Sequence, residues 1–215
     1  MNPLKRLAAP LAKLKAPLRK AGSVALLAGG IAGVVMLAWA VVGPDTPTAV
    51  RGFLGQVPGG AIGIERAEPV RLRIPSIGVD AQVTPLGVDE DGEVQVPPLA
   101  YSMVTGWYHR GPSPGELGAA VILGHVDAAP AGPAVFYDLG KLKPGAEVAV
   151  ARDDGRTAVF TVEAVRSFPK DAFPHEKIYG PVQRAEVRLV TCGGPFEGDA
   201  YRDNLVVFAV LSEVR

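Results

Sequence analysis

The sequence predicts a mainly β domain, built as a closed barrel or a sandwich of about eight short strands. Short runs in which apolar and polar residues alternate recur through residues 69–215, and turn signals such as Asp91-Gly92 and Pro144-Gly145 separate them. No long apolar repeat at helical spacing follows residue 68, although Val135 to Leu142 has room for one or two helical turns. The domain is therefore expected to contain few helices.

The expected strands follow from this alternation in chain order. Val70 to Ile74 is the first, and it ends at Pro75, which has no N–H for a strand ladder. The others are residues 77–83, 94–96, 119–123, 147–151, 158–167, 186–191 and 205–211. The turn at Asp153-Asp154-Gly155 predicts a hairpin between two of them.

The N-terminal region predicts a membrane anchor. Residues 1–21 contain six cations and no acid, and residues 22–42 carry no charge. As a helix, the uncharged run spans about 30 Å, enough to cross a bilayer. Ala38-Trp39-Ala40 also fits the cleavage site of a signal peptide, but the apolar run is longer than such peptides need, so we favour an uncleaved signal anchor. The positive-inside rule then places the N-terminus in the cytoplasm and the remainder outside the cell, in a single-pass membrane protein.

Residues 43–68 are rich in Gly, Pro, Thr and Ala, which predicts an extracytoplasmic linker before the folded domain at 69–215. The six N-terminal cations leave 16 basic and 22 acidic residues after position 42. This modest negative charge argues against nucleic acid as a partner.

Cys192 is the only cysteine, and it follows the apolar run Leu189 to Thr191 and precedes two glycines. A lone exported cysteine is either a small buried residue or a nucleophile. His125 also follows an apolar strand that ends in glycine, so a barrel can bring the two strand ends together. Arg202 is of interest because the strand that it precedes is expected to pair with the Cys192 strand.

Two other functions fit the same residues. His125, Asp127 and Cys192 could serve an exported zinc hydrolase, but no metal-binding spacing supports this set, and no acidic cluster indicates calcium. We therefore predict no metal and no cofactor. The other alternative is a membrane-tethered, non-catalytic β-barrel binding module in which Cys192 is structural.

Several ordered motifs resemble the sortases, the membrane-anchored cysteine transpeptidases of Gram-positive bacteria. They are Arg73 to Asp80, Gly106-Trp107-Tyr108, Ile122 to Asp127, Leu189 to Cys192 and Tyr201 to Ala209. The Gly-His-Val-Asp and Thr-Cys-Gly-Gly forms, with Phe168 to Pro174, look most like the actinobacterial class F group, and class E is the nearest alternative.

The resemblance implies a closed eight-stranded barrel with short helices and a monomeric enzyme. It assigns Cys192 as the nucleophile, His125 as the acid/base and Arg202 as the group that positions substrate or stabilises the oxyanion. The implied reaction cleaves an LPxTG-like sorting signal of a secreted protein through a thioacyl intermediate. The acyl group is then passed to an amine of the peptidoglycan precursor.

One departure concerns the arginine. The best-known sortases have it directly before the last strand, where this chain has Asn204. Arg202, two residues earlier, keeps the same face of an extended segment, so we rank it above Arg188, which shares parity with Cys192 but lies about 13 Å away. The expected substrate contacts are Thr191, Asp127, Phe173, His175 and Tyr179.

Overall fold

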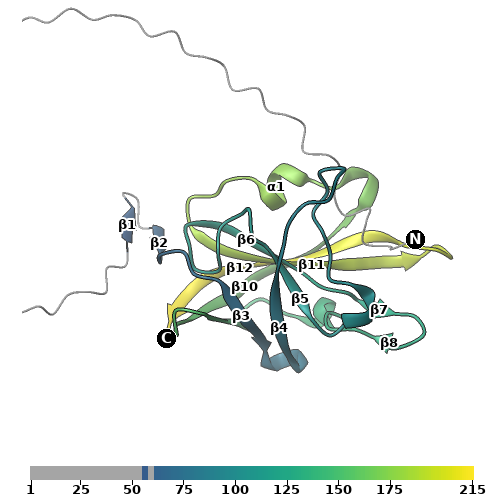
Figure 1. The fold of residues 1–215 in the computed structure, drawn as a ribbon, viewed down its shortest axis with the longest axis horizontal. Helices are drawn as coiled ribbons and strands as arrows, with labels where there is room; N and C mark the ends of the chain where they lie inside the picture. Colours follow the sequence, from purple (N-terminus) through teal and green to yellow (C-terminus); the bar gives the residue numbers. More distant parts are fainter. Residues whose placement is uncertain (1–54, 58–60) are drawn as a thin grey trace, which may run out of the picture. The chain divides into compact units, whose positions relative to one another are not determined.

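The computed structural model describes residues 55–57 and 61–215. Eight strands form a closed barrel in the order β10-β12-β11-β6-β5-β4-β3-β9, which confirms the predicted barrel (Figure 1). The predicted anchor at 22–42 lies outside the described residues. Within the described part of the chain, no helix is both long enough and apolar enough to cross a membrane.

The element bounds are as follows. The barrel strands are β3 (Pro69–Ile74), β4 (Val79–Leu86), β5 (Thr105–Tyr108), β6 (Gly118–Leu123), β9 (Glu147–Arg152), β10 (Thr157–Pro169), β11 (Ala185–Phe196) and β12 (Tyr201–Val214). Two short pairs are β1 (Gly55–Val57) with β2 (Ala61–Gly63), and β7 (Asp127–Ala128) with β8 (Gly132–Pro133). The helical turns are η2 (Pro75–Ile77), η3 (Leu99–Tyr101), η4 (Leu139–Lys141), η5 (Lys170–Ala172) and α1 (His175–Tyr179).

Two expected strands differ from the structure. Residues 94–96 form no strand, because only Val94 bridges to Val88. The strand expected at 77 begins at Val79, after the turn η2 closes on Gly78 with φ +67°. The short strand β5 was not predicted, since three of its four residues are buried and it shows no alternation.

The predicted hairpin at Asp153-Asp154-Gly155 is confirmed, because β9 and β10 pair antiparallel across it. Gly155 has φ +80°, a conformation that favours glycine. The helical turn expected between Val135 and Leu142 is the short element η4.

Strand β6 is buried on both faces, and this separates two apolar clusters. Ala120 and Ile122 pack inside the barrel with Leu189 of β11. Val121 and Leu123 face outward, where they pack in a cluster that also contains Cys192. Burial of each large apolar side chain contributes about 1.5–3 kcal/mol. The outer face of β6 and β11 is therefore a second core rather than a solvated surface.

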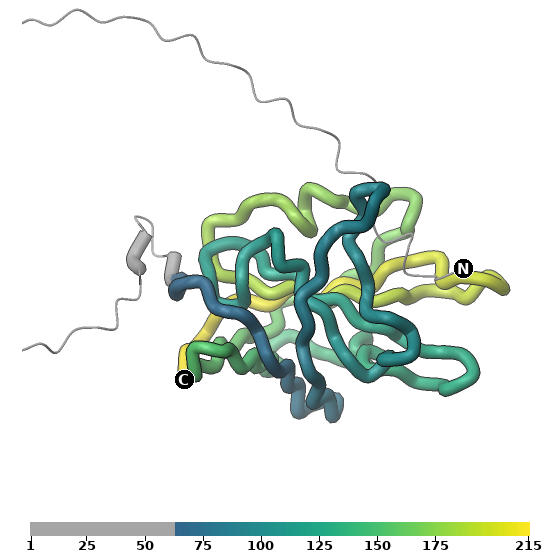
Figure 2. Tube along the Cα trace, viewed as in Figure 1, coloured from purple at the N-terminus to yellow at the C-terminus, as the bar shows by residue number. Residues whose placement is uncertain are grey.

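The cover of this second core is the connection between β10 and β11. The tube in Figure 2 shows this light green segment passing along one side of the barrel, and α1 contacts β6. Ile178 of α1 is fully buried in the outer cluster, together with Phe173. The connection thus forms one wall beside the strands that carry Cys192 and His125.

The residues just before Pro69 also contact the barrel. The N–H of Ile64 donates to the Gly115 carbonyl at 2.8 Å, and the Ile64 side chain is buried. The Arg66 guanidinium lies 5.1 Å from the centroid of the Trp107 ring. Pro69 is therefore the first residue of the barrel, but not the first residue that packs against it.

Candidate active site

Cys192 lies in β11 at the point where this strand loses one of its two neighbours. The register of β11 with β6 ends at Val190 and Leu123, whereas pairing with β12 continues and sets Cys192 opposite Asn204. Gly194, with φ +73°, follows where the ladder becomes irregular. The thiol is thus carried by a strand that is paired with β12 but no longer with β6 at this level.

His125 is brought level with Cys192 by the same parallel register. Leu123 pairs with Val190, and the N–H of Gly124 donates to the Val190 carbonyl at 3.1 Å. His125 and Cys192 each lie two residues beyond the last matched pair, so their side chains leave the two strands on the same face. A Cβ at Gly124 would lie 2.6 Å from the Phe136 ring, which explains the glycine before His125.

The imidazole of His125 is buried, and one of its nitrogens is already bound. Nε2 lies 2.7 Å from the carbonyl oxygen of Pro97, an oxygen that can only accept. The neutral ring therefore carries its proton on Nε2 and leaves Nδ1 free to accept one. Burial lowers the pKa of His125, an effect opposed by the Pro97 carbonyl and by Asp127.

The thiol of Cys192 is held mainly in its neutral form. Its pKa is raised to about 11, mainly by burial and to a smaller extent by Asp127, while Lys170 acts in the opposite direction. At neutral pH a neutral thiol and a neutral imidazole therefore predominate. The reactive thiolate–imidazolium pair is a minority state that arises when the thiol proton passes to His125.

This charge state predicts a broad pH profile. The reactive pair increases with pH until His125 passes its lowered pKa, stays level, and decreases as Cys192 loses its proton around pH 11. We expect kcat/KM for a peptide substrate to rise below neutral pH and remain high well into the alkaline range. A steep alkaline loss immediately above neutral pH would contradict the high thiol pKa.

Arg202 lies on the same face as Asn204 and Cys192 but does not point its charge at the sulfur. Its Nε donates to Asp203 Oδ1 at 3.0 Å, and just over half of its side chain is exposed. It lines a cavity of about 320 Å³ together with Lys170 and Tyr201. The structure therefore places the predicted arginine at the rim of the site rather than in contact with the thiol.

Arg188 has a different role. Its guanidinium is buried, donates to the carbonyls of Lys177 and Ile178, and pairs with Glu186 at 3.0 Å. Its charge also lies 5.6 Å from the Phe208 ring centroid. These contacts hold α1 against the barrel. They also occupy both terminal nitrogens of the Arg188 guanidinium, so neither is free to bind a substrate.

The five expected substrate contacts separate into three groups. Asp127 lies on β7 and accepts a hydrogen bond from the Tyr201 hydroxyl, next to the Cys192–His125 pair. Phe173, His175 and Tyr179 belong to the connection over the outer face of β6. Thr191 is buried on the opposite face of β11 from Cys192, and its hydroxyl has no hydrogen-bond partner.

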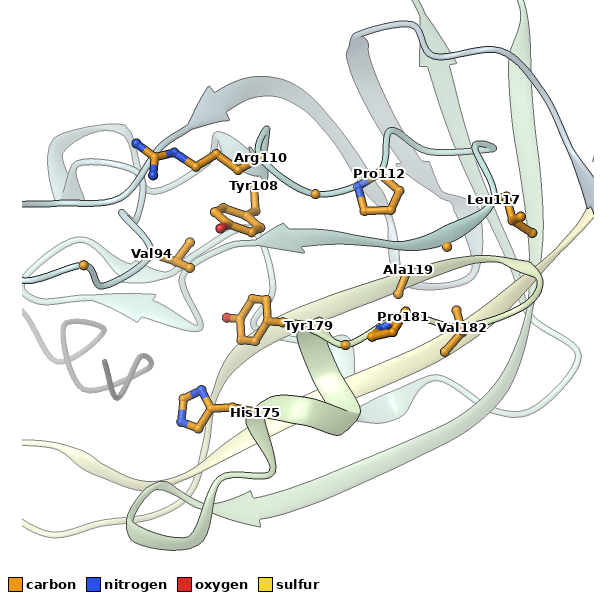
Figure 3. A pocket seen from close by; sticks show the side chains of 14 residues that line it. Val94, Tyr108, Arg110, Pro112, Leu117, Ala119, His175, Tyr179, Pro181 and Val182 are labelled. Carbon is orange, nitrogen blue, oxygen red and sulfur yellow. The ribbon is translucent and has the colours of Figure 1, made fainter. Parts of the chain in front are cut away.

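A cavity of about 420 Å³ lies between β6 and the connection that contains α1. Figure 3 shows Tyr108 and Tyr179 close together in this lining, and Ala119 of β6 farther along it, near Pro181 and Val182. The two tyrosine rings meet edge to face, with centroids 5.9 Å apart. His125 lies two residues beyond the end of β6 and six residues after Ala119, so about 20 Å separates the Ala119 end of the cavity from the histidine.

Three features of the site were not found from the sequence. Pro97 binds His125 from a segment predicted to be a strand boundary, Tyr201 bonds Asp127, and Lys170 interacts with Cys192. The sequence shows Lys170 shortly after the predicted strand 158–167. Whether this lysine approaches Cys192 depends on a strand register that the sequence does not specify. Asn204 is fully buried opposite Cys192, and neither polar atom of its amide has a partner.

Metal binding has little support in the described residues. Across residues 55–57 and 61–215, no three His, Cys, Asp or Glu side chains are grouped closely enough to hold a metal ion. His125, Asp127 and Cys192 accordingly form no such group.

Comparison with known families identifies one match. The model of the sortase domain family matches residues 72–212. A comparison of the sequence with curated proteins found no match.

Solved structures show the same fold. Sortase A from Listeria monocytogenes is 17% identical with a TM-score of 0.52, over 69% of this chain and 90% of that one. Sortase C-1 from Actinomyces oris is 22% identical with a TM-score of 0.53, over 68% of this chain and 76% of that one. Sortase A from Corynebacterium diphtheriae is 20% identical with a TM-score of 0.51, over 69% and 62% respectively.

Proposed function

Because the chain belongs to the sortase family of cysteine transpeptidases, we propose that it cleaves an LPxTG-like sorting signal and transfers the acyl fragment to a cell-wall amine. The observation that carries this proposal is the parallel register of β6 and β11, which sets Cys192 level with His125 on one face. A cysteine–histidine pair at adjacent strand ends is the arrangement that thiol acyl transfer requires.

The chemistry follows from the two side chains. The Cys192 proton passes to Nδ1 of His125, and the thiolate attacks the carbonyl carbon of the sorting signal. The C–N bond then breaks, the imidazolium gives its proton to the departing amine, and a thioester remains. An incoming amine loses a proton to His125, attacks the thioester and forms a new amide, which restores the thiol.

Arg202 is proposed as the group that receives the developing oxyanion. Its present partner, Asp203, is an adjacent residue, and the ion pair lies at an exposed rim. Such pairs contribute at most about 1 kcal/mol, so a substrate can draw the guanidinium away from Asp203. The planar, permanently charged group can then donate to the oxyanion.

The cavity beside α1 is proposed to receive the apolar start of the sorting signal. Ala119 lines the cavity on the outer face of β6, and Val121 and Leu123, which lie between it and His125, are buried under the connection, so an extended peptide would reach the thiol over this cover and not along the strand itself. His175 and Tyr179 of the connection line the cavity, and the ring of Phe173, from the same connection, packs against His175.

The finer assignments are proposals from sequence. The motifs around His125 and Cys192 favour class F, with class E as the alternative, in an actinobacterial Gram-positive cell. The apolar run 22–42 supports a single-pass anchor, with the enzyme domain on the outer surface of the membrane and acting as a monomer.

The experiment is intact-mass analysis of the full-length protein incubated with a library of LPxTG-type peptides. An adduct equal to an acyl fragment is expected on the wild type and not on Cys192→Ala, and an added amine should remove it by forming a transfer product. A protein that binds these peptides without a Cys192-dependent adduct would instead be the tethered binding module.

A further inference from the structure

The end of β10 places a lysine directly beside the catalytic strands. Phe168 pairs with Asn204 and Pro169 with Asp203, while these two β12 residues pair with Cys192 and Gly193 of β11. Lys170 is the next residue, and it is half-buried at the start of η5. Because Pro169 has no N–H to continue the ladder, the chain turns here. Lys170 therefore leaves the ladder one residue beyond the level of Asp203 and Gly193, next to the strand that carries Cys192.

The ammonium group of Lys170 uses this position to reach the nucleophile. It donates a hydrogen bond to the Cys192 sulfur, and it lines the same cavity as Arg202 and Tyr201. The other two basic groups of the site are engaged elsewhere. Arg202 is paired with Asp203, and the bonded nitrogen of His125 faces the Pro97 carbonyl.

We propose that Lys170 is a positioning residue that acts through Cys192, because its ammonium group holds the deprotonated sulfur in place beside His125. The proposal concerns the same site as the proposed function, but it makes a statement about the thiol before any substrate is bound. The proton that leaves the sulfur goes to His125, and Lys170 stays charged throughout. A charge-assisted hydrogen bond is among the stronger polar contacts available to a buried anion.

The charged groups around the sulfur act in opposite directions. Asp127 of β7 disfavours the thiolate, and the Tyr201 hydroxyl of β12 is hydrogen-bonded to that carboxylate. The carboxylate of Asp203 on β12 is attracted by the charge of Lys170, and it accepts hydrogen bonds from Arg202 and Ser167. His125, at the end of β6, supplies a cation only when it is protonated. Among these groups, Lys170 is the cation in direct contact with the sulfur.

The test measures the thiol of the full-length protein without peptide. The rate of alkylation of Cys192 by iodoacetamide is recorded against pH for wild type, Lys170→Met and Lys170→Arg, and thiolate absorbance is recorded with Cys192→Ala as the blank. We expect Lys170→Met to move both midpoints to higher pH by about one pH unit and to slow alkylation near neutral pH by about tenfold. Lys170→Arg should restore most of the rate, because it keeps the charge.

Lys177→Met is the matched control. Lys177 belongs to the same connection, but its ammonium lies over the Phe168 and Phe208 rings, 5.6 Å from each centroid. Its alkylation and absorbance profiles should coincide with those of wild type.

Folding of each variant is checked by circular dichroism, and Lys170→Gln replaces Lys170→Met if the latter does not fold. A folded charge-free variant with the wild-type thiol profile would overturn the role of Lys170. It would leave the proposed function intact, since that rests on the peptide adduct. Conversely, a shifted thiol profile in a protein that forms no adduct would support Lys170 and count against the proposed peptide substrate.

Discussion

Replacing Cys192 with alanine is expected to abolish peptide cleavage and transfer, with loss of at least about a thousandfold in kcat/KM. The sulfur is the atom that forms the thioester, and no other cysteine exists in the chain to replace it. Folding should change little, because the substitution removes one sulfur atom from a strand that is held by β12 on one side. The measurement is release of a fluorescent fragment from an LPxTG-type peptide, with thermal unfolding followed in parallel.

His125→Gln tests the second member of the pair with little structural change. The glutamine amide can still donate to the Pro97 carbonyl, so the packing around position 125 is preserved while the proton acceptor is lost. We expect a loss similar to that of Cys192→Ala, because the two residues act as one unit. Near-normal turnover in either variant would refute the mechanism.

His109→Gln is the matched control for this experiment. His109 is exposed on the loop after β5, away from the end of β6, and only its backbone takes part in the hydrogen bonds of that loop. Its activity should equal that of wild type. A loss comparable to His125→Gln would show that the assay reports general damage rather than loss of a proton acceptor.

The strand framework could be predicted because most barrel strands face the core on one side. Val148 and Val150 of β9 alternate with less buried residues, and this alternation can be recognised in the amino-acid sequence. The strand β5 was missed because Thr105, Gly106 and Trp107 are all buried, so no alternation exists. Residues 94–96 were wrongly predicted because Val94 is buried by packing against the outer cluster rather than by strand pairing.

The site was predictable to the extent that it follows from strand ends. Cys192 and His125 each follow an apolar strand, and a parallel register brings them level, although 67 residues separate them in the chain. The roles of Lys170 and Arg188 were not predictable, because each depends on a contact between a strand and the β10–β11 connection that strand alternation does not specify. Arg188 shares parity with Cys192, yet its guanidinium is bound to carbonyls of α1. This helix has only five residues, too few for a helical repeat to be recognised in the sequence.

Arg202→Ala is expected to lower kcat by about a hundredfold with a smaller change in KM. An oxyanion forms only after attack on the carbonyl, so its stabilising group contributes mainly in the transition state. Arg202→Lys should recover part of the rate, because a point charge replaces a planar fork. The side chain is exposed at the rim and paired only with its neighbour Asp203, so stability should be close to that of wild type.

Arg188→Ala separates the two arginines. Its removal leaves buried carbonyls of α1 without their donor and takes one of the two cations that pair with Glu186, so the free energy of unfolding should fall by about 2 kcal/mol. Activity per folded molecule should fall less than in Arg202→Ala, and the main change should be a lower Tm. If Arg188→Ala stayed stable but lost kcat while Arg202→Ala remained active, the oxyanion role would belong to Arg188. Its contacts with α1 would then have to open whenever substrate binds.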